Sequence, residues 1–328
     1  MSYIDLHCDT LMKAFFGGET DIYAIRDTHV NVKKLKEAGV RAQFFAVFFP
    51  RREEGGKTHF GEMPEDLMYF TAMRQILFDT IKNHSEEIAF AENGEELAQN
   101  VREGKVSAFL TLEDGRAVDG SVERLLWFYE QGVRLITLTW NDENCFGAPN
   151  SRNPAIMQKG LTAFGKEAIA VMNEKGILID VSHLSDGGFR DVAELTEKPF
   201  VASHSNTRSL APHPRNLTDG MIRTIAEKGG VAGLNFYGPF LNADVQSEAS
   251  TLERMAAHAM HMYRVGGEDV IAIGTDFDGF EGEESMLEID GPGQMERLFD
   301  RLRENGFSGR MLDKFQYGNV ERVIRDVL

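Results

Sequence analysis

The feature that most constrains the fold is a regular alternation of short apolar segments with longer amphipathic segments along the chain. The apolar, β-branched segments that predict strands are 3–7, 40–49, 106–113, 133–140, 176–183, 199–205, 231–236 and 270–276. Segments with helical spacing of apolar residues lie between them, at 32–38, 65–83, 121–130, 162–174, 186–195, 219–227, 250–264 and 295–305. Such alternation is typical of right-handed βαβ units and a parallel sheet. Eight strands and eight helices favour a closed (β/α)8 TIM barrel, a single α/β domain over residues 1–328.

Glycines at the ends of several predicted helices support this alternation. Gly39, Gly132, Gly176 and Gly229 each follow a polar helical turn and directly precede a predicted strand. Glycine at this point allows the left-handed conformation that commonly ends a helix. The charged, glycine-rich segment 51–62 predicts a long loop, and residues 309–328 predict one or two closing helices.

Composition excludes several functional classes. Lys and Arg number 35 against 52 Asp and Glu, a net charge of −17, which argues against binding to nucleic acid or to an anionic membrane surface. The longest apolar run, 42–50, is too short to span a bilayer, and the first residues lack the pattern of a secretion signal. Two cysteines, Cys8 and Cys145, cannot build a disulfide framework. We therefore expect a cytoplasmic protein.

Residue types that bind metals follow five of the eight predicted strands. They are His7 and Asp9, Glu113, His183, His204, and Asp276 with Asp278. In a parallel barrel the carboxyl ends of all strands share one rim, so these side chains are expected to converge. Imidazoles and carboxylates together suit Zn²⁺ or a similar divalent ion.

Each of these residues also has a simpler explanation when it is taken alone. A lone histidine after an apolar run is more often a satisfied core residue than a ligand, but His183 and His204 follow consecutive strands. Of Asp276 and Asp278, one is a candidate ligand or general acid–base, and the other a candidate anchor for the turn before the next glycine. His258 has no neighbouring carboxylate, and we expect it on a solvent-exposed helix face.

Motifs for other chemistries are missing from the sequence. It contains no G-x-G-x-x-G after a strand, no phosphate-binding G-x-x-x-x-G-K-[ST], no G-x-S-x-G and no H-E-x-x-H. Nucleotide-dependent reactions and serine hydrolysis therefore lack support.

Several segments, in this order and spacing, resemble the membrane (renal) dipeptidase family, a group of amidohydrolase-type barrels. They are IDLHCDT, FLTLEDG, GVRLITLTWN, GILIDVSH, VASHSNTRSL, PRN at 214–216, NFY at 235–237 and IGTDFDG. The resemblance covers nearly the whole chain. It implies a zinc-dependent dipeptidase that cleaves L,L- or L,D-dipeptides by attack of a metal-bridging hydroxide, with a homodimer as a possible assembly.

The resemblance also implies roles for individual residues. His7 and Asp9 would bind one of two zinc ions, His183 and His204 the other, and Glu113 would bridge both. Asp276 would transfer the proton. Arg215 would bind the terminal carboxylate of the substrate, and Tyr237 would also line its site.

One residue departs from the family pattern. Where mammalian members carry a histidine after the fourth strand, this chain has Trp140. An indole donates one hydrogen bond but cannot accept a proton. Asn141 and Asn144 are the candidate replacement donors to the oxyanion, and Trp140 and Asn141 are expected at the substrate.

Two other functions stay open. One is a different binuclear amidohydrolase, such as a lactonase or an N-acyl amino acid deacylase. The other is a non-catalytic metal-binding barrel, for which Trp140 is the argument.

Overall fold

In this computed structural model the described residues are 2–53, 57–244, 246–280 and 286–328, and among them eight parallel strands close into a barrel. Around the ring these are β1 (Ile4–Cys8), β2 (Ala42–Phe48), β6 (Val106–Glu113), β7 (Val133–Thr137), β8 (Leu178–Asp180), β9 (Val201–Ala202), β10 (Val231–Leu234) and β11 (Ile271–Ile273). Pairing of β2 with β6, and of β11 with β1, completes the ring. The prediction of a (β/α)8 TIM barrel is confirmed.

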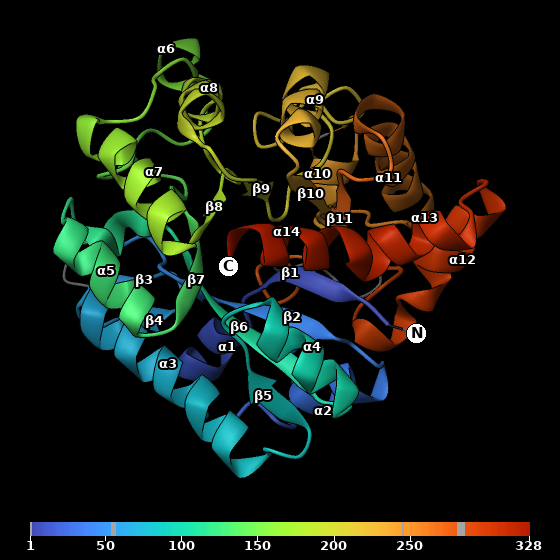
Figure 1. Ribbon diagram of the computed structural model, residues 1–328, viewed down its shortest axis with the longest axis horizontal. Coiled ribbons are helices and arrows are strands. Elements are labelled where there is room, and N and C mark those ends of the chain that lie inside the picture. Colours follow the sequence, from blue (N-terminus) through green and yellow to red (C-terminus); the bar gives the residue numbers. More distant parts are fainter. Residues whose placement is uncertain (1, 54–56, 245, 281–285) are drawn as a thin grey trace.

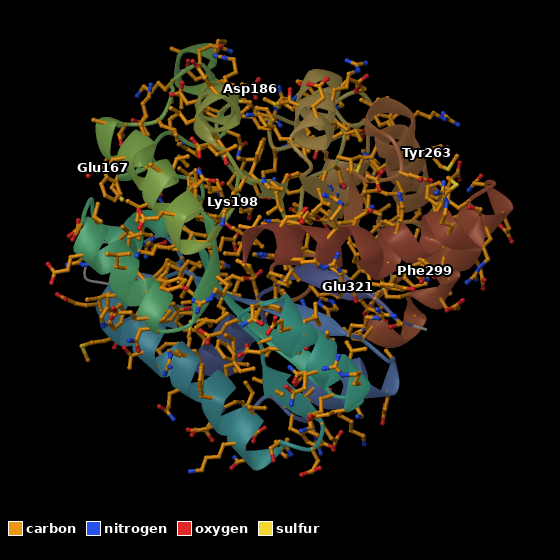
Figure 2. All side chains as sticks on the ribbon, viewed as in Figure 1. Glu167, Asp186, Lys198, Tyr263, Phe299 and Glu321 are labelled. Carbon is orange, nitrogen blue, oxygen red and sulfur yellow. The ribbon has the colours of Figure 1, made fainter. Side chains whose placement is uncertain are left out.

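Most of the helices form an outer layer around the strands, and the last one crosses the barrel in the view of Figure 1. They are α1 (Thr10–Gly17), α2 (Val32–Glu37), α3 (Asp66–Asn83), α4 (Gly94–Arg102), α5 (Val122–Glu130), α6 (Pro154–Met157), α7 (Ala163–Lys175), α8 (Asp186–Leu195), α9 (Asp219–Glu227), α10 (Gly238–Leu241), α11 (Leu252–Gly266), α12 (Glu296–Glu304), α13 (Gly309–Asp313) and α14 (Asn319–Val327). Side chains at the periphery such as Glu167 are exposed, whereas Phe299 of α12 is buried (Figure 2).

Two hydrophobic cores hold the barrel together. The larger core lies between the strands and the surrounding helices. The smaller one fills the barrel interior, where Phe44 and Phe109 stack with ring centroids 4.6 Å apart. Val320, Val323 and Ile324 of α14 belong to the same interior cluster, so α14 closes the end of the barrel where the strands begin. The strands are therefore buried on both faces, as their continuous apolar sequences predict.

The glycine predictions are confirmed, since Gly39, Gly132, Gly176 and Gly229 all have positive φ, between 71° and 98°. Residues 309–328 form α13 and α14, as expected. Most of the strand predictions were too long at the carboxyl end, most clearly 199–205, where only Val201–Ala202 is extended in a ladder, whereas 106–113 matches β6 at both ends.

Some elements were not predicted. The segment 51–62 contains a small hairpin, β3 (Lys57–Thr58) with β4 (Gly61–Glu62), while 54–56 lie outside the described residues. β5 (Ile88–Phe90) pairs with the beginning of β6, and α1 and α4 were also missed.

The expectation for His258 was wrong, because its side chain is fully buried. Its Nδ1 accepts a hydrogen bond from the backbone N–H of Thr207 (3.1 Å), and its Nε2–H donates to the carbonyl of Leu241 (3.0 Å). This ring is a satisfied core residue that joins α11 to the end of α10 and to the loop after β9.

Among the helices that the structure describes, none has the length and apolar character needed to cross a membrane.

Candidate metal centre

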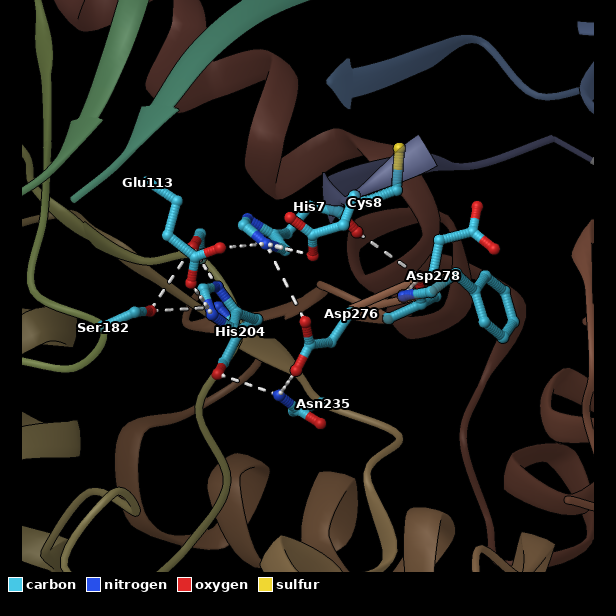
Figure 3. A network of polar contacts seen from close by, with 12 residues as sticks. His7, Cys8, Glu113, Ser182, His204, Asn235, Asp276 and Asp278 are labelled. Atoms are coloured by element: carbon cyan, nitrogen blue, oxygen red, sulfur yellow. Dashed lines mark hydrogen bonds and ion pairs between the residues drawn. The ribbon is translucent and has the colours of Figure 1, made fainter. Parts of the chain in front are cut away.

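The carboxyl-terminal rim of the barrel gathers the predicted ligands (Figure 3). His7 is the second-to-last residue of β1 and Glu113 is the last residue of β6, and both side chains are buried. His183 and Asp276 follow β8 and β11 with φ of 66° and 63°. This left-handed conformation is costly for residues other than glycine, and it turns both side chains out of the strand direction.

Glu113 occupies the middle of the cluster. Its Oε2 lies 3.2 Å from His7 Nε2. Its Oε1 lies 3.0 Å from His183 Nε2 and 3.3 Å from His204 Nε2. One oxygen of the Glu113 carboxylate therefore faces the imidazole of His7, and the other faces the imidazoles of His183 and His204.

Three sets of side chains bring potential ligand atoms within 4.8 Å of one another. The sets are His7–Asp9–Glu113, Glu113–His183–His204 and His7–His204–Asp276. Within them, His7 Nε2 lies 3.2 Å from Asp9 Oδ2 and 3.8 Å from Asp276 Oδ1. All six residues that sequence analysis assigned to metal binding or proton transfer thus lie together.

The chemistry of this donor set fits divalent cations. The Nε2 atoms of His183 and His204 lie 3.2 Å apart, and both face the carboxylate of Glu113. Asp9 Oδ1 is buried without a hydrogen-bond partner in the described structure. Buried polar atoms are normally satisfied, and closely spaced acceptors around one point are satisfied by cations.

The charges of the cluster lead to the same conclusion. Burial alone would lower the pKa of His7, but Glu113 and Asp9 raise it well above its ordinary value. Burial raises the pKa of Asp9 to about 7, and it lowers the pKa of His183 to about 4. The carboxylates of the cluster thus stabilise positive charge near His7, while the imidazole of His183 stays neutral, as a metal ligand must be.

A second layer of hydrogen bonds orients His204. Its Nδ1–H donates to Ser203 Oγ (2.6 Å), and the Ser203 hydroxyl donates to Asp180 Oδ2 (2.5 Å). Asp180 also accepts from Thr137 Oγ1 (2.6 Å). This chain fixes the tautomer of His204 with the Nε2 lone pair toward Glu113, the arrangement typical of metal-binding histidines.

Asp276 and Asp278 separate into two environments. Asn235 Nδ2–H donates to Asp276 Oδ2 (2.8 Å), and burial raises the pKa of Asp276 to about 6, with His7 opposing the shift. Asp278 instead accepts from Thr10 Oγ1 (2.6 Å) and from the backbone N–H of His29 (2.7 Å). Asp278 therefore anchors the start of α1 and the loop that contains His29, whereas Asp276 faces the cluster.

A cavity of about 600 Å³ opens above the cluster. The four residues expected at the substrate, Trp140, Asn141, Arg215 and Tyr237, all line it. The Nη2–H of the buried Arg215 donates to the carbonyl of His204 (2.9 Å).

Asn144 was wrongly considered as a substrate donor. Its Nδ2 donates to Asp114 Oδ1 (2.6 Å), after β6, and to the carbonyl of Leu138 (2.8 Å), after β7, so both amide hydrogens join these two segments.

His213 also lines the cavity and was missed by sequence analysis. Its Nδ1 accepts from the backbone N–H of Arg215 (3.1 Å). Burial lowers the pKa of His213 to about 4, helped by nearby arginines, so the neutral ring carries its proton on Nε2. The sequence signal that could have identified His213 is its position two residues before Arg215. No apolar strand precedes it, which is why the search at strand ends did not find it.

Comparison with known proteins gives a consistent family. Residues 1–328 match the family model described as membrane dipeptidase (peptidase family M19). An uncharacterized protein from the pqqA 5′ region of Klebsiella pneumoniae is 38% identical over 234 residues, which cover 70% of this chain and 85% of that protein. An uncharacterized dipeptidase of Schizosaccharomyces pombe is 29% identical over 266 residues, 80% of this chain and 64% of the yeast protein.

Solved structures agree in fold. The crystal structure of dipeptidase AC, a metallopeptidase of family M19, superposes with a TM-score of 0.88 at 26% identity over 100% of this chain and 98% of that one. A metallopeptidase from Rhodobacter sphaeroides, solved with a phosphinate mimic of the dipeptide L-Ala-D-Ala, has a TM-score of 0.87 at 24% identity, covering 100% and 99%.

Proposed function

Because the chain belongs to the membrane dipeptidase family, peptidase family M19, and is a metal-dependent dipeptidase, we propose that it cleaves L,L- or L,D-dipeptides with two zinc ions. One catalytic domain over residues 1–328 carries the activity. The residues proposed to hold the ions are His7, Asp9, Glu113, His183 and His204.

The position of Glu113 is the observation that carries this proposal. Its Oε2 is 3.2 Å from the imidazole of His7, and its Oε1 is 3.0 Å from that of His183. A carboxylate between two groups of nitrogen ligands suits a pair of ions that share it. Bound divalent ions supply Lewis-acid activation of water and of the scissile carbonyl.

Asp276 is the proposed proton carrier. Its Oδ1 accepts a proton from the attacking water and returns it to the nitrogen of the leaving amine. A carboxyl group can serve both steps, first as general base and then as general acid. The hydrogen bond from Asn235 holds Oδ2 (2.8 Å) and leaves Oδ1 toward the cluster.

Arg215 and His213 are proposed to bind the substrate's terminal carboxylate. The guanidinium group is held by the carbonyl of His204 and by Ser205 Oγ, which fixes its plane at the cavity. The Nε2–H of the neutral His213 adds a second donor. A charged and a neutral donor together favour a carboxylate over an uncharged end.

The test combines metal analysis of purified protein with a substrate panel. We expect about two zinc ions per chain and hydrolysis of dipeptides in preference to lactones and N-acyl amino acids. Zinc-loaded protein that cleaves lactones or N-acyl amino acids but no dipeptide would overturn the proposal in favour of another amidohydrolase activity. Zinc-loaded protein without any hydrolysis would favour a non-catalytic barrel.

Two further points belong to this proposal. Cys8 and Cys145 are both free, which supports a reducing compartment and hence the cytoplasm. The homodimer implied by the family resemblance stays a prediction, which sedimentation of the purified protein tests.

A further inference from the structure

Aromatic side chains line the cavity in two groups. We call Phe48, Phe60 and Trp140 the first wall, and Tyr237, Phe240 and Phe280 the second wall. In the first wall, Phe48 and Trp140 pack edge to face at 4.9 Å, and Phe48 and Phe60 at 6.4 Å. In the second wall, Tyr237 contacts Phe240 at 4.9 Å and Phe280 at 5.4 Å.

The order of strands places the two walls on opposite sides of the rim. Phe48 ends β2 and Trp140 follows β7, and these strands flank β6 with its Glu113. The second wall follows β10 and β11, across the barrel from β6. The predicted metal ligands, which lie at or directly after the ends of β1, β6, β8 and β9, therefore lie between the walls.

The carboxylate donors lie on the side of the second wall. Arg215 and His213 come from the loop after β9, the strand next to β10. The ring of His213 lies 4.8 Å from that of Phe240. A dipeptide whose carboxylate is held there extends its C-terminal residue along the second wall, and its peptide bond reaches the metal ligands.

The N-terminal residue must then lie on the far side of the metal ligands, next to the first wall. Trp140 is close to this point, since its ring centroid lies 6.3 Å from that of His183. Trp140 and Phe60 are both partly exposed to the cavity, whereas Phe48 behind them is 5% exposed. The first wall thus offers open aromatic faces on a packed support.

We infer that the first wall receives the side chain of the substrate's N-terminal residue and selects dipeptides in which that residue is large and apolar or aromatic. The inference rests on the proposed function. Apolar side chains gain by leaving water against aromatic faces, and a charged side chain would lose hydration there.

The kinetic test uses X-Ala dipeptides in which X is Phe, Leu, Ala, Lys or Glu. For zinc-loaded wild-type protein we expect kcat/KM for Phe-Ala and Leu-Ala to exceed that for Ala-Ala by about 10-fold, with Lys-Ala and Glu-Ala below them. Trp140→Ala and Phe60→Ala should reduce the Phe-Ala to Ala-Ala ratio several-fold. Wild-type preference for Lys-Ala or Glu-Ala would overturn the inference.

Phe240→Ala is the matched control, because it removes an aromatic ring from the second wall. It should alter the preference in an Ala-X series and leave the X-Ala ratios unchanged. If Phe240→Ala reduced the X-Ala ratio as much as Trp140→Ala does, the assignment of the walls would be wrong.

A binding measurement separates failure of the inference from failure of the proposed function. The chain has two tryptophans, and Trp127 lies on α5, packed against Phe70 at 5.6 Å. In a Trp127→Phe protein the fluorescence therefore reports on Trp140 alone. Phosphinate analogues of Phe-Ala should change this emission more, and bind more tightly, than analogues of Ala-Ala.

Two outcomes are then distinguishable. Dipeptide hydrolysis without N-terminal preference, and without a change in Trp140 emission, would overturn the inference and leave the proposed function intact. Tight binding of the Phe-Ala analogue with no hydrolysis of any dipeptide would overturn the proposed function while supporting the wall.

Discussion

Asp276 combines three properties that no other carboxylate of the cluster shares. It follows β11 in a left-handed conformation, one oxygen is held by Asn235, and the other lies 3.8 Å from His7 Nε2. Asp9 and Glu113 are closer to the imidazoles, and Asp278 instead accepts a hydrogen bond from Thr10 at the start of α1. These properties support the proposal that Asp276 transfers the proton and is not an essential metal ligand.

Replacing Asp276 tests this assignment. We expect Asp276→Asn to lower kcat by about 10²- to 10⁴-fold, the usual range for loss of a general acid–base. The zinc content should stay near that of the wild type. Steady-state kinetics and metal analysis of the same preparation check both statements, and full activity in the variant would refute the role.

The pH dependence of the reaction tests the same group through its neighbour. The hydrogen bond from Asn235 favours the charged form of Asp276 and so lowers its pKa. Asn235→Ala should raise that pKa, so activity should begin to fall at a higher pH as the solution is acidified. Profiles of kcat/KM measure the shift, and an acidic limb that stays in place or moves to lower pH contradicts the account.

Among the elements, the strands show what the sequence can and cannot reveal. Apolar runs identified all eight barrel strands, and β6 at 106–113 was predicted with its observed bounds. The convergence of the ligands was predictable, because the carboxyl ends of all strands in a parallel barrel lie at the same rim. The ends of β8 and β11 were not predictable, because His183 and Asp276 leave the extended conformation through tertiary contacts at the rim. His213 was missed because it lies in a loop, where Arg215 and Phe240 position its ring.

The start of α3 is connected by hydrogen bonds to the segments that follow β2 and β6. Asp66, in the first turn of α3, accepts hydrogen bonds from Arg52 (2.8 Å) and from Arg116 Nε (3.1 Å). Arg52 lies in the loop after β2, and Arg116 lies in a short 3-10 helix, Gly115–Val118, that follows β6. Burial raises the pKa of Asp66, but the two arginines outweigh it and leave the pKa below its ordinary value.

Asp66→Asn should therefore destabilise the fold by about 1–2 kcal/mol at neutral pH. A carboxyl whose pKa is lower in the folded state stabilises the protein above its unfolded pKa, and the contribution fades as the pH falls through the folded value. Urea unfolding at pH 7 and at decreasing pH below about 4 measures this. A difference between variant and wild type that grows under acid would contradict it.

In the whole molecule, the barrel separates stability from chemistry. The interior core and α14 fill the end where the strands begin, and the ligand cluster occupies the opposite end. Ile324 of α14 is fully buried in the interior cluster, while the adjacent Arg325 is exposed.

Ile324→Ala should lower the free energy of unfolding by about 2–4 kcal/mol, since it leaves a cavity in a closed core. The kcat/KM of the folded variant at low temperature should stay close to that of the wild type. Arg325→Ala is the matched control and should change stability by less than about 0.5 kcal/mol. Denaturant unfolding with parallel kinetics tests this, and a large loss of kcat/KM in folded Ile324→Ala protein would show that the two ends are coupled.

The central claim is that the side chains at the rim hold a pair of ions that share Glu113. Anomalous diffraction at the zinc absorption edge, from crystals of zinc-loaded protein, measures this directly. The account predicts two peaks, one among His7, Asp9 and Glu113 and one among Glu113, His183 and His204. A single peak, or zinc bound away from Glu113, would contradict it.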